Sequence, residues 1–428
     1  MTTPRILSLR PTANRLLLLV GQLWAVPIVA AIRLLRPFII IRIDCLHSEY
    51  FGHYAGNVEL YLCERDLGIG RPTRRHVDLW FNLTPVVSNS QLERMWRTHL
   101  NILPRVLLAP VYRLNRSLPF GQIHQIVPTY YDRDVNNLLG RLPPHLVFTA
   151  EEEAMGLRCL AAMGVPPEAR FVCLNVRDAA FHKGKTFTNY RNAEIRRYRP
   201  AAHELVRRGF YVLRMGKSVQ HRLESGSDRI IDYANSQWRS DFMDLYLGAK
   251  CYFAVSTSSG WDNVPGVLFR RPVVYTNVVP ISQIQTWNEK TLAIPKRHWS
   301  NTHQRFLTLS EMFQLIDRGF NSSKPRFDDL NVSVIENTES EILDVVVEMA
   351  DRLEAPEFDG PVENALQDEF WHLYRINLSR CHLEHLHGTI NLRIGRRFLE
   401  GAPELTTDTF NFDPTLRSLS GSSAGRNH

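Results

Sequence analysis

Short apolar runs alternate with amphipathic segments along most of the chain. The clearest runs are rich in β-branched and aromatic residues and cover 38–43 (FIIIRI), 76–83, 171–176 (FVCLNV), 210–216 (FYVLRMG), 251–255 and 272–277. Their length and composition predict buried strands, and 105–109 and 229–233 fit the same interpretation. Strand and helix patterns that repeat at this spacing predict an α/β fold with parallel sheets covered by helices on both faces.

Helical patterns fill the intervals between the strands. Their approximate ranges are 57–64, 91–103, 149–163, 193–208, 241–250 and 262–269, and beyond residue 309 they are 310–318, 339–353, 362–374 and 389–399. Thr149 and Glu152 have the spacing of a capping box at the start of a helix. The stretch 111–146 carries many Pro, Asn and Arg residues and predicts loops with short helices.

Breaks in this pattern predict the domain boundaries. Gly164, Pro166 and Pro167 interrupt the chain between two series of strand–helix units. The expected divisions are an N-terminal helix 1–36, a Rossmann-like domain 37–164, a second Rossmann-like domain 165–330, a helical extension 331–405 and a tail 406–428. The tail is polar and rich in Gly and Ser, so we expect it to be disordered.

The segment 16–32 is almost wholly apolar and is flanked by arginines on both sides. As a helix it would reach only about 26 Å, short of a hydrocarbon core of about 30 Å. We therefore expect a helix that lies in an anionic membrane surface, with a transmembrane span and a buried core helix as alternatives. No small-residue cleavage site follows, so a removed signal peptide is not expected.

The composition is that of a folded, soluble protein with a basic balance. It has 44% hydrophobic and 22% charged residues and a formal charge of +7, and all but 7 of its 51 basic residues are Arg. Arg suits phosphate and carboxylate groups, although a GC-rich genome would give the same bias. No basic run is dense enough to predict nucleic-acid binding. The six cysteines lack CxxC spacing and predict reduced thiols in the cytosol.

The stretch 249–280 organises the second half of the chain. Its strand 251–255 runs into the hydroxyl residues Ser256, Thr257, Ser258 and Ser259 and then Gly260, at the start of a predicted helix. Backbone N–H groups, hydroxyls and the positive end of a helix dipole together favour a bound phosphate. The alternative is that one hydroxyl caps the helix and the others have no such role.

Basic residues follow the neighbouring strands. Arg177 and Asp178 end the strand 171–176, and Arg191 lies in the next loop. Arg214, Gly216 and Lys217 end the strand 210–216, and Asp241 lies in the first turn of a helix. The carboxyl ends of parallel strands share one edge of a sheet, so these residues predict an anion site there. A P-loop is excluded because Tyr211 stands where its first glycine is required.

The first strand, 38–43, leads into a glycine-containing loop with His47 and His53 and then a helix with Glu59. Their place after a buried strand makes these three residues candidates for chemistry, although each is commonly a loop or capping residue. Gly52 and Gly56 would let another molecule approach His53 closely.

Metal and cofactor motifs are missing from the sequence. The cluster Cys381, His382, Glu384, His385 and His387 has neither HExxH nor HxxEH spacing, and we interpret it as a solvated helix end. No acidic pair stands in a loop after a strand. We therefore expect neither a metal ion nor a cofactor.

The chain resembles a family of bacterial glycosyltransferases of surface-carbohydrate biosynthesis. The matching segments include FGHYAGNVELYLCE, YRNAEIRRYRPAAHELVRRGFYVLRMG, RIIDYANSQWRSDFMDLYLGAKCYFAVSTSSG and VPGVLFRRPVVYTNVVP. The second half is also distantly similar to protein O-fucosyltransferases, which have a His-x-Arg motif at a strand end. Asn175 stands at the His position of that motif and Arg177 at the Arg position.

The resemblance implies a GT-B-like fold, in which two Rossmann-like doubly wound domains face a cleft, with a helical C-terminal extension. It implies a transferase of hexosyl or deoxyhexosyl groups that moves sugar from a nucleotide-sugar donor to a surface-polysaccharide, lipid-linked or protein acceptor. The N-terminal domain would hold the acceptor and the other the donor. The enzyme would be metal-independent, cytoplasmic and in contact with the inner face of the membrane.

Roles for the candidate residues follow from this interpretation. His53, and next Glu59, would be the general base. Arg177 would stabilise the leaving diphosphate, and Asp178 would orient Arg177. The donor would be held by Asn175, Arg191, Arg214, Gly216, Lys217, Asp241, Ser256, Thr257, Ser258, Ser259 and Gly260. The alternatives are a nucleotide-sugar epimerase on the same fold and a non-catalytic scaffold at the membrane surface.

Overall fold

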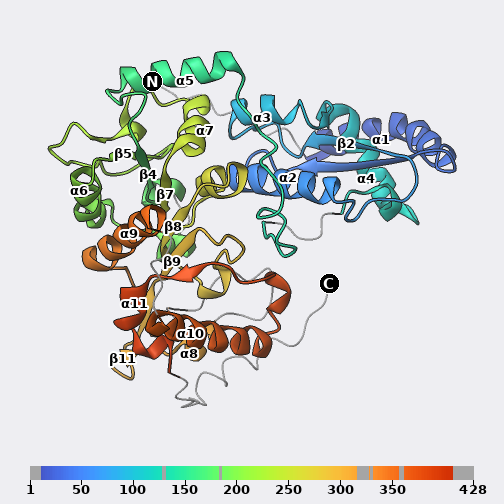
Figure 1. Ribbon diagram of the computed structural model, residues 1–428. Coiled ribbons are helices and arrows are strands. Elements are labelled where there is room, and N and C mark those ends of the chain that lie inside the picture. The colour runs from blue at the N-terminus through green and yellow to red at the C-terminus, as the bar shows by residue number, and fades with distance from the viewer. Residues whose placement is uncertain are drawn as a thin grey trace, which may run out of the picture. The chain divides into compact units, whose positions relative to one another are not determined.

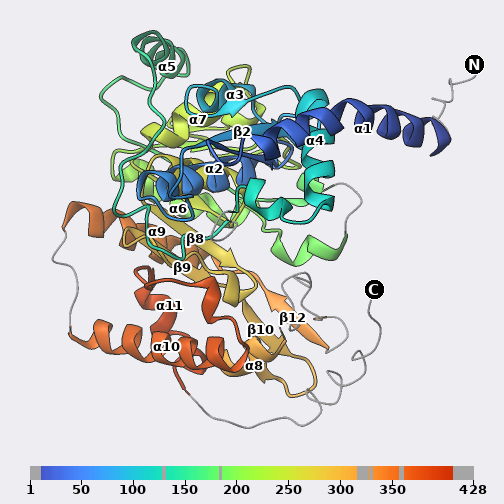
Figure 2. The ribbon, with the colours of Figure 1, turned by 90° about the vertical axis from the view of Figure 1, so that its right-hand side faces the viewer.

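The computed structural model describes residues 11–127, 132–182, 186–315, 327, 331–355 and 361–407. The chain forms two compact units, Met1–Asp132 and Arg133–His428, and each unit has its own parallel sheet (Figures 1 and 2). Most of the expected tail, from residue 408 onward, lies outside the described residues.

The first unit has a short parallel sheet of three strands. β1 (Ile40–Leu46), β2 (His76–Asn82) and β3 (Asn101–Ile102) lie in the order β1-β2-β3. A parallel bridge from Gln125 to Ile43 lies on the other edge of β1, so β1 has a neighbour on both sides. The strands predicted over 38–43 and 76–83 are therefore confirmed.

Helices α1 (Pro11–Leu34), α2 (Phe51–Asp66), α3 (Ser90–Trp96) and α4 (Arg105–Ser117) surround this sheet. α1 and α4 pack on each other. The core beneath them consists of apolar residues from four elements: Ala25, Val29, Ile32, Ile43, Phe81, Leu108, Ala109 and Val111. One side of α1 is thus buried, as in the core-helix alternative. No helix in the described part of the chain is long and apolar enough to cross a membrane.

Two predictions for this unit are wrong. The segment 105–109, predicted as a strand, is the first half of α4. Five apolar residues do not distinguish a strand from a buried helix face, and Leu108, Val111 and Asn115 show the helical spacing of buried positions. The predicted helix 91–103 ends early, at Trp96, and its last residues enter β3.

The second unit is built on a parallel sheet of seven strands. In chain order they are β4 (Phe171–Asn175), β5 (Tyr211–Arg214), β6 (Ile230–Ile231), β7 (Phe253–Ser256), β8 (Val273–Val278), β9 (Thr291–Pro295) and β13 (Arg393–Ile394). Their spatial order is β13-β9-β8-β7-β4-β5-β6, with all neighbours parallel. This is the doubly wound order of a Rossmann fold extended by β13. The strand order reverses between β4 and β7.

Helices cover the sheet of the second unit. α6 (Arg199–Arg207) packs against β5 and β6 and against α9 (Glu339–Glu354), which also contacts β8 and β9. α7 (Asp241–Lys250) leads into β7. α5 (Ala150–Ala162) starts with the predicted capping box and packs on α7, where Lys250 Nζ lies 2.6 Å from Glu153 Oε1. α5 therefore belongs to the second unit, whereas the sequence placed it before the boundary.

The C-terminal part is integrated into this unit. It contributes α8 (Leu309–Gln314), α10 (Pro361–Arg380) and α11 (Arg396–Glu400), besides α9 and β13. A small antiparallel sheet of β10 (Arg297–Ser300), β11 (Arg305–Phe306) and β12 (Val332–Ile335) is also present. The predicted helix 389–399 is wrong in its first half, because residues there form β13 at the sheet edge.

Candidate functional site

The ends of β4 and β7 meet at the point where the strand order of the second sheet reverses. Asn175 is paired with Ser256 across the two strands. Asn175 Nδ2 donates to Ser259 Oγ at 2.5 Å, and the backbone N–H of Arg177 donates to Thr257 Oγ1 at 2.9 Å. The structure thus brings together the predicted strand-end residues of β4 and the predicted hydroxyl residues after β7. Such a crevice is where open α/β sheets bind ligands.

The hydroxyl residues after β7 form a turn whose hydrogen bonds are largely internal. Asp262 Oδ2 accepts from Ser256 Oγ at 3.0 Å and from the Ser259 N–H at 2.7 Å. Ser259 Oγ in turn accepts from the N–H of Trp261. Asp262 is fully buried, which raises the pKa of its carboxyl to about 7. The hydroxyls of Ser256 and Ser259 therefore shape the turn, as in the capping alternative.

The helix predicted after this turn differs from the expectation. Gly260–Asp262 is a single 3₁₀ turn and Val264–Leu268 is a short π-helix, so no regular α-helix starts here. Pro265 lies inside the segment and cannot donate to a helical ladder. A segment this short has little macrodipole, so the predicted phosphate site at a helix N-terminus is wrong in that respect. Any positive charge must come from side chains.

Two arginines supply that charge. Arg191 Nη2 donates to the carbonyl of Ser258 at 2.7 Å, and this places its guanidinium beside the turn. Arg177 is only 6% exposed, and burial, followed by the nearby charge of Arg191, lowers the pKa of Arg177 to about 10. An anion bound here would offset both the burial of Arg177 and the repulsion between the two cations.

The loop that carries Arg191 is held by a buried lysine that sequence reasoning missed. Lys296 lies between β9 and β10, is 2% exposed, and donates from Nζ to the carbonyls of Tyr190 at 2.9 Å and Asn192 at 2.6 Å. These two residues flank Arg191. Burial lowers the pKa of Lys296 to about 8. No sequence motif marks this residue, because its role depends on the fold.

Arg214 and Asp178 belong to an inner layer of the site. Arg214 is fully buried at the end of β5, with Nη2 3.7 Å from Asp178 Oδ2 and Nη1 3.6 Å from Asp232 Oδ1. Asp178 also accepts from the N–H groups of Ala180 and Gln220. We expected Asp178 to orient Arg177; the structure instead pairs it with Arg214 and with the backbone of the adjoining loops.

The remaining predicted donor residues lie around the same end of the sheet. Gly216 follows β5 with a φ of +147°, and a Cβ there would lie 2.6 Å from Val219 Cγ1. Lys217 is exposed. Asp241 lies in the first turn of α7, 4.0 Å from Arg239 Nη2. The structure thus gives Gly216 a conformational role and leaves the roles of Lys217 and Asp241 as predictions.

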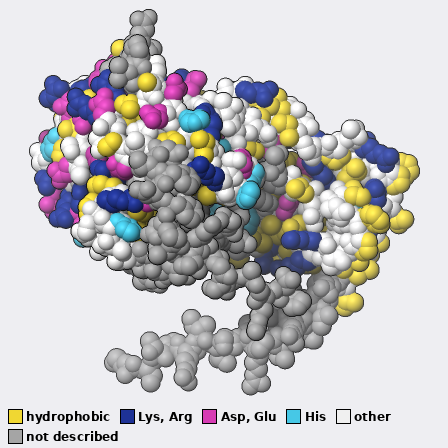
Figure 3. Space-filling view, turned by 90° about the horizontal axis from the view of Figure 1, so that it is seen from below, with side chains coloured by type: hydrophobic (Ala, Val, Ile, Leu, Met, Phe, Trp, Pro, Cys, Tyr) yellow, Lys and Arg dark blue, Asp and Glu magenta, His cyan; other side chains and the backbone are white. Residues whose placement is uncertain are grey.

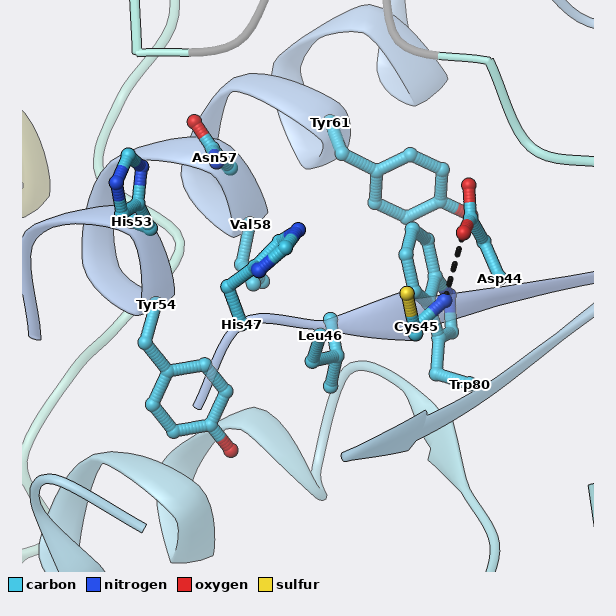
Figure 4. A pocket seen from close by; sticks show the side chains of 10 residues that line it. All are labelled: Asp44, Cys45, Leu46, His47, His53, Tyr54, Asn57, Val58, Tyr61 and Trp80. Carbon is cyan, nitrogen blue, oxygen red and sulfur yellow. Dashed lines mark hydrogen bonds between the residues drawn. The ribbon is translucent and has the colours of Figure 1, made fainter. Parts of the chain in front are cut away.

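The first unit has a small hollow at the carboxyl end of β1. Figure 4 shows side chains from β1 and α2 converging on it. The lining residues are Asp44, Cys45, Leu46, His47, His53, Tyr54, Asn57, Val58, Tyr61 and Trp80. Of the predicted candidates, His47 and His53 line this hollow. Glu59 does not: it is fully buried in α2.

His53 lies in the first turn of α2, and the prediction of a loop at this position is wrong because the helix already starts at Phe51. Its Nδ1 is 2.5 Å from Asp132 Oδ2. This hydrogen bond raises the pKa of His53, outweighing the opposing effect of burial. Asn57 Oδ1 accepts from the N–H of Asp132 at 2.7 Å and so holds the backbone of Asp132. The pair has the form of a general base with an orienting carboxylate.

Sequence reasoning missed two acidic residues, Asp44 in the lining of the hollow and Asp132 beside His53. Asp132 lies far from His53 in the sequence and no motif joins them. Asp44 lies within β1 in the string IRIDCL, and its burial raises the pKa of its carboxyl to about 6. A carboxylate within a strand of apolar residues was a usable signal for Asp44.

Comparisons with known proteins give a distant likeness. No family model and no curated protein sequence matches the chain. Among solved structures, the E. coli ADP-heptose lps heptosyltransferase II is 15% identical, with 60% of this chain and 90% of that chain covered at a TM-score of 0.37. A glycosyl transferase family 9 protein from Veillonella parvula is 11% identical (56% and 80%, TM-score 0.37). The E. coli heptosyltransferase WaaC with ADP is 10% identical (60% and 91%, TM-score 0.31). Similarity at these scores carries no functional argument, so we rely on the side chains of this chain.

Proposed function

We propose that this protein is a glycosyltransferase that moves a sugar from a nucleotide-sugar donor to an acceptor hydroxyl. The observation that carries the proposal is the pair Arg177 and Arg191 beside the Ser256–Gly260 turn, at the reversal point of a Rossmann-type sheet. A nucleoside diphosphate leaving group needs positive charge and N–H donors at one place. Asp262, the carboxylate of the turn, is hydrogen-bonded to Ser256 and to the Ser259 N–H.

On the donor side, the two guanidinium groups bind the diphosphate and stabilise the charge that builds up as the sugar–phosphate bond breaks. Asn175 and the turn set the position of the anion, and Lys296 holds the loop with Arg191. Because fixed guanidinium groups neutralise the leaving group, we propose that transfer is metal-independent. Arg214 and Asp178 are buried and support the loops of this site from the interior of the unit.

On the acceptor side, His53 is the general base. Its Nδ1–H donates to Asp132, so Nε2 is the nitrogen that takes the proton. The acceptor oxygen forms a bond to the anomeric carbon, the bond from that carbon to the phosphate oxygen breaks, and the nucleoside diphosphate leaves. The proton of the hydroxyl ends on Nε2, and Asp132 stabilises the resulting imidazolium. Glu59, the second candidate in the sequence, is fully buried in α2 and does not line the hollow, so we do not assign it this role.

We further propose that the transferred group is a hexosyl or deoxyhexosyl unit and that the acceptor is a surface polysaccharide, a lipid-linked glycan or a protein. The enzyme would work on the cytoplasmic side of the membrane, in peripheral contact with it. The arginine-rich composition and the reduced cysteines support this location.

Thermal-shift screening against UDP-, GDP-, ADP-, dTDP- and CMP-sugars tests the proposal, because a ligand that binds the native state raises its melting temperature. One class of donor is expected to raise it for the native protein and not for Arg177→Ala. Arg207→Ala, which removes the same charge from the exposed side of α6, is the control and should respond as the native protein does. Equal shifts for both variants would contradict the proposed site.

A further inference from the structure

Helix α1 has an apolar surface on the side that faces solvent. Its buried residues Ala25, Val29 and Ile32 pack toward α4 and the sheet. On the opposite side Leu23 is 74% exposed and Leu34 is 76% exposed. No charged, amide or hydroxyl side chain occurs in 23–32. The exposed side of the helix therefore presents apolar side chains to water. A helix that is apolar all round is normally covered on all sides.

Helix α4 extends this apolar surface. Val106 is 72% exposed and Leu107 is about half exposed on the first turn of α4, while Leu108 and Ala109 face the core. Arg33 of α1 bonds to Asn115 of α4, which joins the ends of the two helices. The exposed residues of both helices therefore belong to one surface, which we call the α1–α4 face.

Two exposed aromatic rings lie where the two helices end. Phe38 follows α1 and is 79% exposed, and Phe120 follows α4 and is 66% exposed. Phe120 has a φ of +60°, a left-handed conformation that bulky residues rarely adopt. Aromatic rings are enriched at the boundary between lipid and water. Both rings thus fit the edge of a surface that enters a membrane.

The charged residues of the two helices are of one sign. The sequences of α1 (Pro11–Leu34) and α4 (Arg105–Ser117) contain no Asp or Glu and five arginines. Arg113 lies two helical turns after Val106, on the same side of α4, and is exposed. Figure 3 shows hydrophobic and basic side chains together at the right-hand edge of the view, where these helices lie.

We propose that the α1–α4 face docks on an anionic lipid bilayer, with α4 as a second inserting helix beside α1. An apolar surface with the exposed arginines of α4 beside it matches the acyl chains and the anionic headgroups together. A symmetric dimer through this face would bring its arginines against their own copies, which like charges oppose. The inference does not depend on the transferase chemistry.

Flotation of the full-length protein with vesicles tests the proposal. Vesicles of phosphatidylcholine with phosphatidylglycerol are compared with phosphatidylcholine alone, at low and high salt. The native protein should bind the anionic vesicles, and salt should weaken binding. The double variant Val106→Ser, Leu107→Ser should lower the partition coefficient about tenfold or more, because two large apolar side chains no longer enter the bilayer. Arg113→Gln should lower it about fivefold on anionic vesicles only.

The matched control is Val147→Ser, Leu157→Ser, which replaces the same residue types at exposed positions of the second unit. It should bind vesicles as the native protein does. Three results would overturn the proposal. They are an equal loss of vesicle binding in both double variants, no loss in either, and binding of vesicles without preference for anionic lipid. So would self-association that the Val106→Ser, Leu107→Ser variant abolishes, because a second copy would then cover the face. Nucleotide-sugar binding without vesicles, measured in parallel, separates this result from the proposed function.

Discussion

At the scale of single residues, His53 depends on a carboxylate that is remote in the sequence. Asp132 accepts from its Nδ1, and Asn57 in turn holds the Asp132 backbone. A histidine in a first helical turn without such a partner would be an ordinary surface residue. In the proposed mechanism the pair gives the imidazole a fixed tautomer and leaves Nε2 for the acceptor hydroxyl.

The pH dependence of turnover tests this pair. A general base works in its neutral form, and Asp132 raises the pKa of His53 above its ordinary 6.5. The rate should therefore rise with pH, with a midpoint above 6.5. In Asp132→Asn that midpoint should move down toward 6.5, and the plateau rate should fall at least about tenfold. A pH–rate profile of kcat/KM measures both, and an unmoved midpoint would remove Asp132 from the mechanism.

Replacing His53 itself separates binding from chemistry. His53→Asn should lower kcat by about 10²- to 10⁴-fold, because the hydroxyl loses its base. The donor dissociation constant should not change, since the donor residues belong to the other unit. Steady-state kinetics and calorimetry give the two quantities. A variant that loses donor binding as well would place His53 in a role other than the proposed one.

At the scale of elements, most strands of the parallel sheets were predictable. Strands β4, β5, β7 and β8 are apolar runs bounded by turn residues, and burial on both faces requires such runs. α4 was not predictable as a helix from residues 105–109, because its pattern appears only over a longer window. β9 was missed, since the run TLAIP carries no turn signal of its own and becomes a strand by pairing with β8.

The arrangement of the candidate anion site was predictable in part. The arginines and hydroxyl residues follow strands, so their shared edge was evident from the strand pattern. The internal bonding of the turn through Asp262 and the support from Lys296 were not, because both depend on the path of loops in three dimensions. Asp132 was missed for the same reason.

The loop that carries Arg191 depends on a buried cation. Lys296→Met should weaken donor binding by about tenfold, because the carbonyls of Tyr190 and Asn192 lose their charged donor. The free energy of unfolding should change little or increase, since Met packs well and a buried charge is removed. Calorimetry and denaturant unfolding check the two halves of this prediction. Unchanged donor affinity would show that Lys296 has no part in the site.

The pH dependence of the same lysine has a defined sign. Its pKa is about 8 in the folded protein against an ordinary 10.5, so the unfolded chain holds this proton more tightly. This group therefore makes the free energy of unfolding rise as pH increases from about 8 to 10.5. Donor binding has the opposite trend, because protonated Lys296 holds the loop. The ionisable groups that interact with the charge of Lys296 are Glu336, Arg197 and His298. They act on it in the unfolding measurement and in the donor-binding measurement alike.

The contact between α5 and α7 gives a test of packing. A Cβ at Gly156 would lie 2.2 Å from the ring of the buried Tyr246, whereas one at Gly140 would meet no atom within 4 Å. Gly156→Ala should destabilise the protein by about 1–3 kcal/mol, although alanine is the better helix former. Gly140→Ala should have little effect. Denaturant unfolding of both variants checks the prediction, and equal stability would mean that α5 does not pack on α7 as described.

At the scale of the whole molecule, the strand order explains why the candidate donor site is where it is. The order reverses between β4 and β7, so the loops after these strands diverge to opposite sides and leave a crevice. Arg177 and the Ser256–Gly260 turn follow those two strands. The topology of the second unit therefore provides the kind of edge at which open α/β sheets bind ligands, and we propose that its arginines select an anion.

The most direct test of the central claim is calorimetric titration of a nucleoside diphosphate into the native protein, Arg177→Ala and Arg191→Ala, with Arg207→Ala as the control. The nucleotide is the one whose sugar derivative gives the largest thermal shift. We predict that each of the two site variants weakens binding at least about tenfold, and that Arg207→Ala leaves it unchanged. Native affinity in both Arg177→Ala and Arg191→Ala would contradict the account.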